Sequence, residues 1–173
     1  PIHNIDIAET FREVADLLSI EGANQFRVRS YRQAAQKIDN LSRDLAEMVE
    51  QGEQLTTLSG IGDSIAEKIE EIVKTGKLEQ LEEIKSRTPE ALEELLALSG
   101  LGPERVSALH QELNIESVND LQAAVENQDI RELEGFGEKI EQKIQDELEK
   151  EDKQKSRYML SRAEEYTEPL REY

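Results

Sequence analysis

The sequence lacks cysteine and tryptophan altogether, and it contains only two histidines, His3 and His110. Without cysteine there is no disulfide bond and no thiolate metal site, and two isolated histidines do not form a ligand cluster. No apolar run is as long as a membrane-spanning helix, and no signal peptide is recognisable at Pro1. These absences predict a cytoplasmic protein with no membrane partner.

Segments that alternate like a half-buried strand are also missing. Aromatic residues make up only 4% of the chain, and the apolar content comes from Leu, Ile, Ala and Val beside abundant Glu, Lys, Arg and Gln. This composition is typical of a helical protein. We therefore predict an all-α fold, and we expect a monomer.

Positive charge is scarce, with 21 Lys and Arg against 39 Asp and Glu and a net charge of −18. Residues 87–149 are the most acidic part, with 5 basic and 16 acidic residues. A DNA-binding protein usually has a basic surface, so this balance argues against a nucleic-acid partner. Residues 22–38 are the exception, because they contain Arg27, Arg29, Arg32 and Lys37 and no acid. These four predict a local phosphate-binding surface, and the alternative is a solvated helix face.

A short glycine motif occurs three times, at residues 58–62, 98–102 and 133–137. Each copy reads apolar, Ser or Glu, Gly, apolar, Gly, and a helical pattern follows it. Glycine allows a tight turn with positive φ, so backbone amides can face outward at a helix N-terminus while the apolar residue fills the core. Such amides bind a phosphate oxygen without reading a base. The predicted phosphate-binding glycines are Gly60, Gly62, Gly100, Gly102, Gly135 and Gly137.

Apolar spacing predicts helices over residues 6–20, 25–41, 63–75, 78–85, 103–113, 117–125, 138–148 and 151–173. Asn24 and Ser117 are expected as N-caps, and Ser42 is expected to cap a further short helix that ends at Gly52. The buried face of the first helix is expected to comprise Ile7, Ala8, Phe11, Val14, Ala15 and Leu18. That of the second is expected to comprise Val28, Tyr31, Ala35 and Ile38.

Two segments resemble the N-terminal region of X-family DNA polymerases. Residues 22–41 read GANQFRVRSYRQAAQKIDNL, and residues 55–84 read LTTLSGIGDSIAEKIEEIVKTGKLEQLEEI. The resemblance continues through LSGLGPERVSALHQELNIESVNDL and LEGFGEKIEQKI, and the three-repeat form is similar to the bacterial and archaeal members. It identifies the glycine motifs as helix-hairpin-helix motifs. It implies sequence-independent binding of gapped or nicked DNA at the 5′-phosphate side, in the service of a repair polymerase.

The same resemblance implies a domain plan. Residues 1–86 would form a lyase-like domain with the first hairpin, residues 87–149 a DNA-binding subdomain with the other two, and residues 150–173 a linker helix leading to a palm domain. The family's palm opens with a Gly-Ser motif and carries an Asp-x-Asp metal site, and neither occurs here. We expect no polymerisation by this chain alone. Mg²⁺, dNTP and contact with a palm domain are expected only in a longer polymerase.

The family's lyase chemistry uses a lysine amine, and Lys68 matches that Schiff-base nucleophile. Glu67 matches a neighbouring acid and Tyr31 a tyrosine beside the site. Ser64 and Gln80 stand where better lyases carry lysines, so the resemblance implies a depleted 5′-phosphate pocket. Three readings stay open: an active 5′-deoxyribose phosphate lyase, a solvated Lys68 paired with a glutamate one helical turn away, and a protein-interaction module with vestigial DNA contact. Further DNA contacts are expected at Ser64, Lys68, Glu104 and Arg105.

The resemblance also implies a monovalent cation, Na⁺ or K⁺, at the hairpins. Its ligands would be the backbone carbonyls of Thr56, Leu58 and Ile61 in the first hairpin and of Leu96, Leu98 and Leu101 in the second. The third hairpin departs most from the pattern, with Arg131 and Glu134 near its turn and Phe136 between its glycines. DNA contact is least expected there, and a structural packing role is the alternative.

Overall fold

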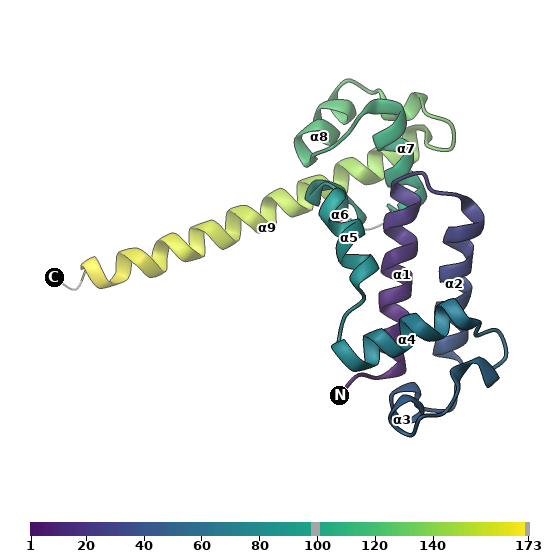
Figure 1. Ribbon diagram of the computed structural model, residues 1–173. Coiled ribbons are helices and arrows are strands. Elements are labelled where there is room, and N and C mark those ends of the chain that lie inside the picture. Colours follow the sequence, from purple (N-terminus) through teal and green to yellow (C-terminus); the bar gives the residue numbers. More distant parts are fainter. Residues whose placement is uncertain (98–100, 172–173) are drawn as a thin grey trace.

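The computed structural model describes the backbone of residues 1–97 and 101–171, and the side chains of those residues except 91 and 161–171. In those ranges the regular elements are all helices (Figure 1), which confirms the predicted all-α fold. They are α1 (Asn4–Ile20), α2 (Gln25–Asp39), α3 (Leu45–Glu50), η1 (Leu55–Thr57), α4 (Asp63–Thr75), α5 (Glu79–Arg87), α6 (Glu90–Ala97), α7 (Pro103–Leu113), α8 (Val118–Glu126), η2 (Ile130–Glu132) and α9 (Gly137–Arg171), where η marks a 3-10 helix.

Helix α1 is the centre of the molecule, and α2, α5 and α7 pack against it (Figure 1). Its predicted apolar face is confirmed, since all six of the residues expected there are fully buried. The predicted face of α2 is confirmed as well, because Val28, Tyr31, Ala35 and Ile38 are each less than 7% exposed. Burial of this apolar surface supplies the main stabilisation of the helical packing.

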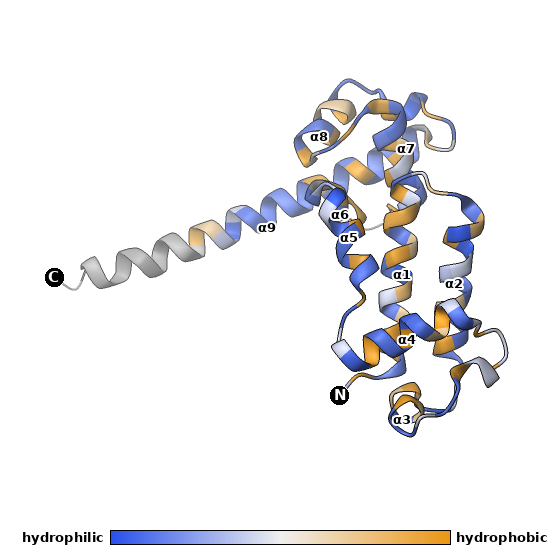
Figure 2. Cartoon of the chain, in the orientation of Figure 1, coloured by the Kyte–Doolittle hydropathy of each residue, from blue (hydrophilic) through white to orange (hydrophobic). Residues whose placement is uncertain are grey.

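The three hairpins lie at two ends of the molecule. Elements α3, η1 and α4 form one end, and α7, α8, η2 and the first turns of α9 form the other (Figure 1). Apolar residues on the inner faces of both ends join a single buried cluster (Figure 2). The Ser107 hydroxyl on α7 donates to the Ile20 carbonyl of α1 at 3.4 Å. The core is thus continuous across the expected boundary at residue 86, and the domain limits themselves stay a prediction.

Two of the three expected caps are confirmed. The Asn24 side chain accepts from the Phe26 amide at 2.8 Å, and the Ser117 hydroxyl accepts from the Asp120 amide at 3.0 Å. The expectation for Ser42 was wrong, because α3 begins at Leu45 and Asp44 is its cap. The cause is a distant contact: the Asn4 side chain accepts from the Leu45 amide at 3.0 Å and fixes where the helix begins.

Helix α9 differs from the expectation of two helices, because it runs unbroken for 35 residues. The chain has neither Gly nor Pro between residues 138 and 168, so nothing interrupts the helical hydrogen bonds. Its first turns pack on η2 and α8, with Glu141 and Ile144 buried, and the helix then leaves the body (Figure 1). No helix in the described ranges is long and apolar enough to cross a lipid bilayer.

Candidate nucleic-acid interface

The first hairpin is a tight turn built on Gly60. The Leu58 amide donates to the Leu55 carbonyl at 3.0 Å, and the Ile61 amide donates to the Leu58 carbonyl at 3.1 Å. Gly60 has φ +83°, a conformation that an L residue adopts only with strain. Ile61 is 4% exposed and fills the core, as the sequence predicted. Gly62 is extended, at φ −86° and ψ 178°, and α4 begins directly after it.

The described part of the second hairpin follows the first closely. Leu101 is buried, and Gly102 is extended at φ −89° and ψ 168° immediately before α7. The expected site residues Leu98 and Gly100 lie outside the described residues. Gly62 and Gly102 therefore adopt one conformation, and each leads into the first turn of a helix.

These two helices begin without a side-chain cap. The N-cap residues of α4 and α7 are Gly62 and Gly102, which have no side chain to accept from the first-turn amides, whereas α2, α3 and α8 are each capped by Asn, Asp or Ser. The amides and the helix dipole at such a terminus attract an anion. Asp63 and Glu104 are exposed acids in these first turns and offset part of that attraction. The donors that the site offers at Glu104 are therefore backbone amides, and its carboxylate opposes binding.

The third hairpin repeats the turn but not the entry into the helix. The Phe136 amide donates to the Leu133 carbonyl at 3.1 Å, Gly135 has φ +85°, and Phe136 is buried, all as in the first hairpin. Gly137, however, has φ +79°, in contrast to the extended Gly62 and Gly102. The third copy therefore presents its helix N-terminus differently from the other two.

A buried carboxylate ties the third hairpin together. Glu141 is 3% exposed, and it accepts from the backbone amide of Arg131 at 2.8 Å and from that residue's guanidinium at 2.9 and 3.1 Å. The hydrogen bonds that the Arg131 guanidinium donates to the Glu141 carboxylate raise the pKa of Arg131, so the pair stays charged. Arg131 also contacts Glu138 at 3.3 Å. Because its cation already has two acidic partners, this hairpin serves packing better than it serves phosphate binding.

Two of the four basic residues predicted on α2 are exposed and unpaired. No ion pair or hydrogen bond in the described part of the chain engages the guanidinium of Arg27 or Arg29. The expectation of an acid-free neighbourhood fails for Arg32, which pairs with Asp16 of α1 at 2.9 Å. The stretch is acid-free in sequence but not in space, because α1 packs beside α2.

The fourth, Lys37, reaches the first hairpin. Its side chain lies so close to Gly60 that a Cβ built on that glycine would stand 1.7 Å from the Lys37 amine. The exposed Lys37 therefore places a positive charge directly over the turn that precedes the uncapped α4. The structure thus brings together two sequence-predicted features that are more than 20 residues apart.

Arg32 in turn lies beside the second hairpin. A surface pocket of about 360 Å³ is lined by Arg32, Gly102, Pro103, Glu104 and Arg105. The predicted contacts at residues 102, 104 and 105 are therefore neighbours of a residue from α2. The basic helix α2 connects the first and second hairpins, with Lys37 near one and Arg32 near the other.

The residues of the expected lyase site form a cluster. The Lys68 amine donates to the Ser64 hydroxyl at 2.9 Å and lies 6.0 Å from the centre of the Tyr31 ring. The Tyr31 hydroxyl donates to Gln80 at 3.0 Å. No ion pair joins Lys68 to a glutamate in the described residues, so the expected alternative of a helix ion pair is absent there. Glu67 is exposed on the same helix and makes none of these contacts.

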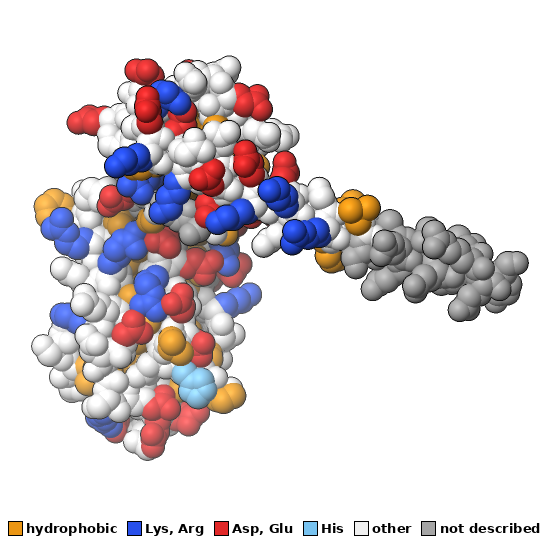
Figure 3. Space-filling view, turned by 180° about the vertical axis from the view of Figure 1, so that it is seen from behind, with side chains coloured by type: hydrophobic (Ala, Val, Ile, Leu, Met, Phe, Trp, Pro, Cys, Tyr) orange, Lys and Arg blue, Asp and Glu red, His pale blue; other side chains and the backbone are white. Residues whose placement is uncertain are grey.

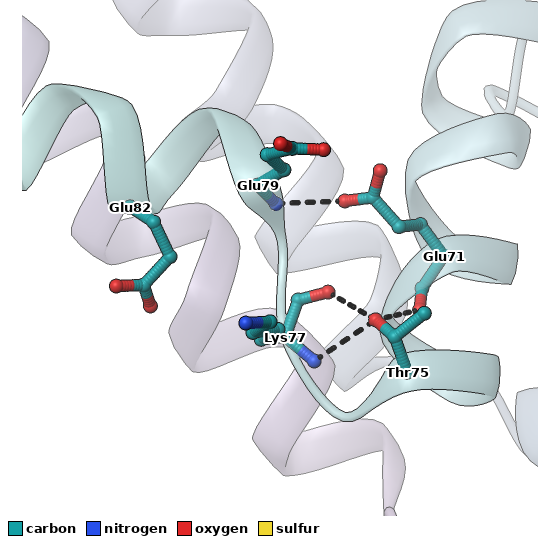
Figure 4. Close-up of a pocket in the computed structure, with 5 residues that line it drawn as sticks. All are labelled: Glu71, Thr75, Lys77, Glu79 and Glu82. Carbon is teal, nitrogen blue, oxygen red and sulfur yellow. Dashed lines mark hydrogen bonds between the residues drawn. The ribbon is translucent and has the colours of Figure 1, made fainter.

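A second pocket, of about 300 Å³, lies where α4 meets α5 and is lined by Glu71, Thr75, Lys77, Glu79 and Glu82 (Figure 4). The Glu71 carboxylate accepts from the Glu79 amide at 2.8 Å, and the Thr75 hydroxyl shares its one proton between the carbonyls of Glu71 and Lys77, at 2.7 and 2.8 Å. These bonds close the turn after α4. Three carboxylates around one pocket repel phosphate, so this pocket is not part of the proposed interface.

For the expected cation, the first hairpin offers a partial fit. The Leu58 carbonyl accepts one hydrogen bond, from the Ile61 amide, and a carbonyl oxygen has two lone pairs. It therefore keeps one acceptor position for a hard cation. In the second hairpin Leu98, one of the three expected carbonyl ligands, lies outside the described residues. No group of three His, Asp or Glu side chains suited to a metal occurs in the described part of the chain.

Sequence reasoning missed the basic side chains of α9. Figure 3 shows Lys and Arg side chains on the near part of α9 and, among Asp and Glu side chains, on the adjoining part of the body. The Lys and Arg residues of this segment recur at helical spacing in the sequence. The prediction of two separate helices, over residues 138–148 and 151–173, divided this pattern between them. The continuous α9 restores that spacing.

These features define a helix-hairpin-helix protein. Residues 2–78 match the family described as helix-hairpin-helix domain, and residues 92–150 match the SAM-like helix-hairpin-helix tandem. The chain is similar to the DNA polymerase/3′-5′ exonuclease PolX of Bacillus subtilis (strain 168), with 34% identity over 162 residues. That alignment covers 94% of this chain and 28% of the relative's length. The resemblance to X-family DNA polymerases is thereby confirmed.

Proposed function

We propose that this chain binds gapped or nicked DNA at its 5′-phosphate side, without reading base sequence, as the DNA-gripping part of an X-family repair polymerase. The observation that carries the proposal is the pair of uncapped helix N-termini on α4 and α7, each behind an extended glycine. Arg27, Arg29 and Lys37 add exposed positive charge on α2. The similarity to a DNA polymerase supports the same partner.

The binding mechanism follows from these donors. Backbone amides at a helix N-terminus bind phosphate oxygens and carry no sequence information, so affinity depends on phosphate spacing and not on bases. A Na⁺ or K⁺ at the first hairpin, on the carbonyls of Thr56, Leu58 and Ile61, would add positive charge beside the phosphate. The acidic remainder of the chain keeps non-specific binding weak. We further propose that the protein acts as a monomer in the cytoplasm and that a palm domain would carry nucleotidyl transfer.

Replacing Arg27 and Arg29 with alanine tests the DNA-binding role. Each guanidinium is expected to neutralise one phosphate, so the slope of log affinity against log salt is expected to fall by about 2 in magnitude. Fluorescence anisotropy with a gapped duplex, measured over about 50 to 200 mM salt, gives this slope.

The matched control removes two exposed lysines from a surface without a proposed role, as Lys74→Ala with Lys77→Ala. Both variants lose two positive charges, so a general charge effect would change them equally. Equal slopes for the two variants would contradict the assignment of Arg27 and Arg29 and would favour the protein-interaction reading.

A second candidate function is a 5′-deoxyribose phosphate lyase, and the contacts of Lys68 favour it. The amine is held by the Ser64 hydroxyl and lies beside the Tyr31 ring. In the reaction the amine attacks C1′ of the ring-opened abasic sugar, and loss of water forms a Schiff base. A proton then leaves C2′ and the C3′–O bond breaks, which releases the DNA strand. The Tyr31 hydroxyl donates to Gln80, and this bond holds the Tyr31 ring beside the Lys68 amine.

A further inference from the structure

One side of α9 carries a row of basic side chains, which we call the α9 basic row: Lys139, Lys143, Lys150, Lys153 and Arg157. Their spacings are 4, 7, 3 and 4 residues. At 3.6 residues per turn these positions fall within about 40° of one line along the helix, and at 1.5 Å per residue the row is roughly 27 Å long. All five side chains are exposed.

The row points away from the body of the protein. The core side of α9 is marked by Glu141 and Ile144, which are buried, and it lies on the opposite part of the helix surface. One acid, Asp146, falls within the row, and its carboxylate accepts from Gln142 at 3.1 Å. The row therefore faces solvent and takes no part in packing.

The positive charge of the row is mostly uncompensated. Within the described residues its only ion pair is the 3.7 Å contact between Lys150 and Glu147. The other four cations have no acidic partner there, although the whole chain carries 39 acids against 21 bases. A concentration of unpaired cations along one line of a strongly acidic protein indicates a partner with a regular line of negative charge.

The row also adjoins the proposed interface. Figure 3 shows Lys and Arg side chains on the near part of α9 and on the adjoining part of the body, with Asp and Glu side chains among them. A polyanion bound by α2 and the hairpins can thus reach further cations along α9. A roughly 27 Å row corresponds to about eight base pairs at 3.4 Å each along one strand.

We propose that the α9 basic row binds the phosphate backbone of a duplex arm of the DNA, outside the part held by the hairpins. This inference rests on the proposed DNA-binding function and adds a second contact region to it. The row contacts phosphates only, so it lengthens the footprint and does not select sequence.

The test compares two triple variants of the full 173-residue chain, each losing three positive charges. The first removes part of the row, as Lys143→Gln, Lys153→Gln and Arg157→Gln. The control removes exposed lysines elsewhere, as Lys74→Gln, Lys77→Gln and Lys155→Gln, of which Lys155 lies on a different side of α9. Glutamine favours helix, and circular dichroism checks that both variants keep it.

Affinity is measured by fluorescence anisotropy as a function of salt concentration. One gapped duplex has two arms of about 20 base pairs, and in two further duplexes one or the other arm is shortened to about 4. Only a long arm spans the roughly eight base pairs that the row covers. On the long-armed probe the row variant is expected to lose about 2 to 3 units of salt slope, and the control less than 1. Shortening the contacted arm is expected to abolish the difference.

Each other outcome is decisive. If wild-type protein binds the long-armed probe and both triple variants bind like it, the row does not contact DNA and the inference fails while the proposed function stands. The same conclusion follows if the variants weaken equally, or if arm length makes no difference to them. If the wild-type chain shows no salt-dependent binding to any probe, both the inference and the proposed function fail.

Discussion

Lys68→Ala is expected to abolish covalent capture of DNA by this protein. With a gapped duplex bearing a 5′-deoxyribose phosphate, borohydride reduction of the Schiff base should give a stable adduct with the wild-type chain and none above background with the variant. The reason is that the amine is the only group of the Ser64, Lys68, Tyr31 and Gln80 cluster that can form an imine. Denaturing gel electrophoresis of labelled DNA measures the adduct.

The matched control is Lys74→Ala, because Lys74 lies on the same helix and is exposed. This variant should retain the adduct, which excludes non-specific trapping by any lysine of α4. DNA affinity should change less than about fivefold in either variant, since a single cation at the surface contributes under about 1 kcal/mol. An adduct that persists at full yield in Lys68→Ala would contradict the role of Lys68. If wild-type protein binds this DNA but gives no adduct, the proposal of a lyase fails and the proposal of DNA binding stands.

Gly60→Ala is expected to weaken DNA binding about tenfold or more. A methyl group at this position would stand 1.7 Å from the Lys37 amine, so the flexible lysine must leave its place over the first hairpin. The positive φ of Gly60 adds strain of about 1 to 2 kcal/mol for an L residue, which distorts the turn that presents the α4 amides. Anisotropy with a gapped duplex measures the affinity, and thermal unfolding measures the stability.

Gly52→Ala separates these two effects. Gly52 has a similar φ of +72°, but nothing lies within 4 Å of a Cβ built on it. Its substitution should therefore lower the unfolding free energy by about 1 to 2 kcal/mol, the cost of a positive φ for an L residue. It should leave DNA affinity unchanged. If Gly60→Ala and Gly52→Ala bind DNA equally well, the first hairpin is not a phosphate site.

Local patterns in the sequence were sufficient for most of the fold. The helix over residues 63–75 was predicted with the limits of α4, because a glycine turn precedes it and Gly76, at φ +81°, ends it. The buried faces of α1 and α2 followed from apolar spacing. The start of α3 could not be predicted, since Ser42 and Asp44 are both good caps and the distant Asn4 decides between them.

The candidate site was predictable only in part, for the same reason. The glycine turns and their buried apolar residues could be located from local sequence, and so could Arg27 and Arg29. The pairing of Arg32 with Asp16 and the position of Lys37 over Gly60 depend on helix packing, which no local pattern encodes. The different conformation of Gly137 was not predicted either, although Arg131, Glu134 and Phe136 had marked this hairpin as the one that departs most from the pattern.

The central claim is that this acidic protein binds DNA through its phosphates alone. The most direct test is the salt dependence of wild-type affinity for two gapped duplexes of identical geometry and unrelated sequence. We expect one steep slope for both, near 0.9 per phosphate contacted, and affinities that agree within a few fold. A flat salt dependence, or a strong preference for one of the two sequences, would contradict the claim.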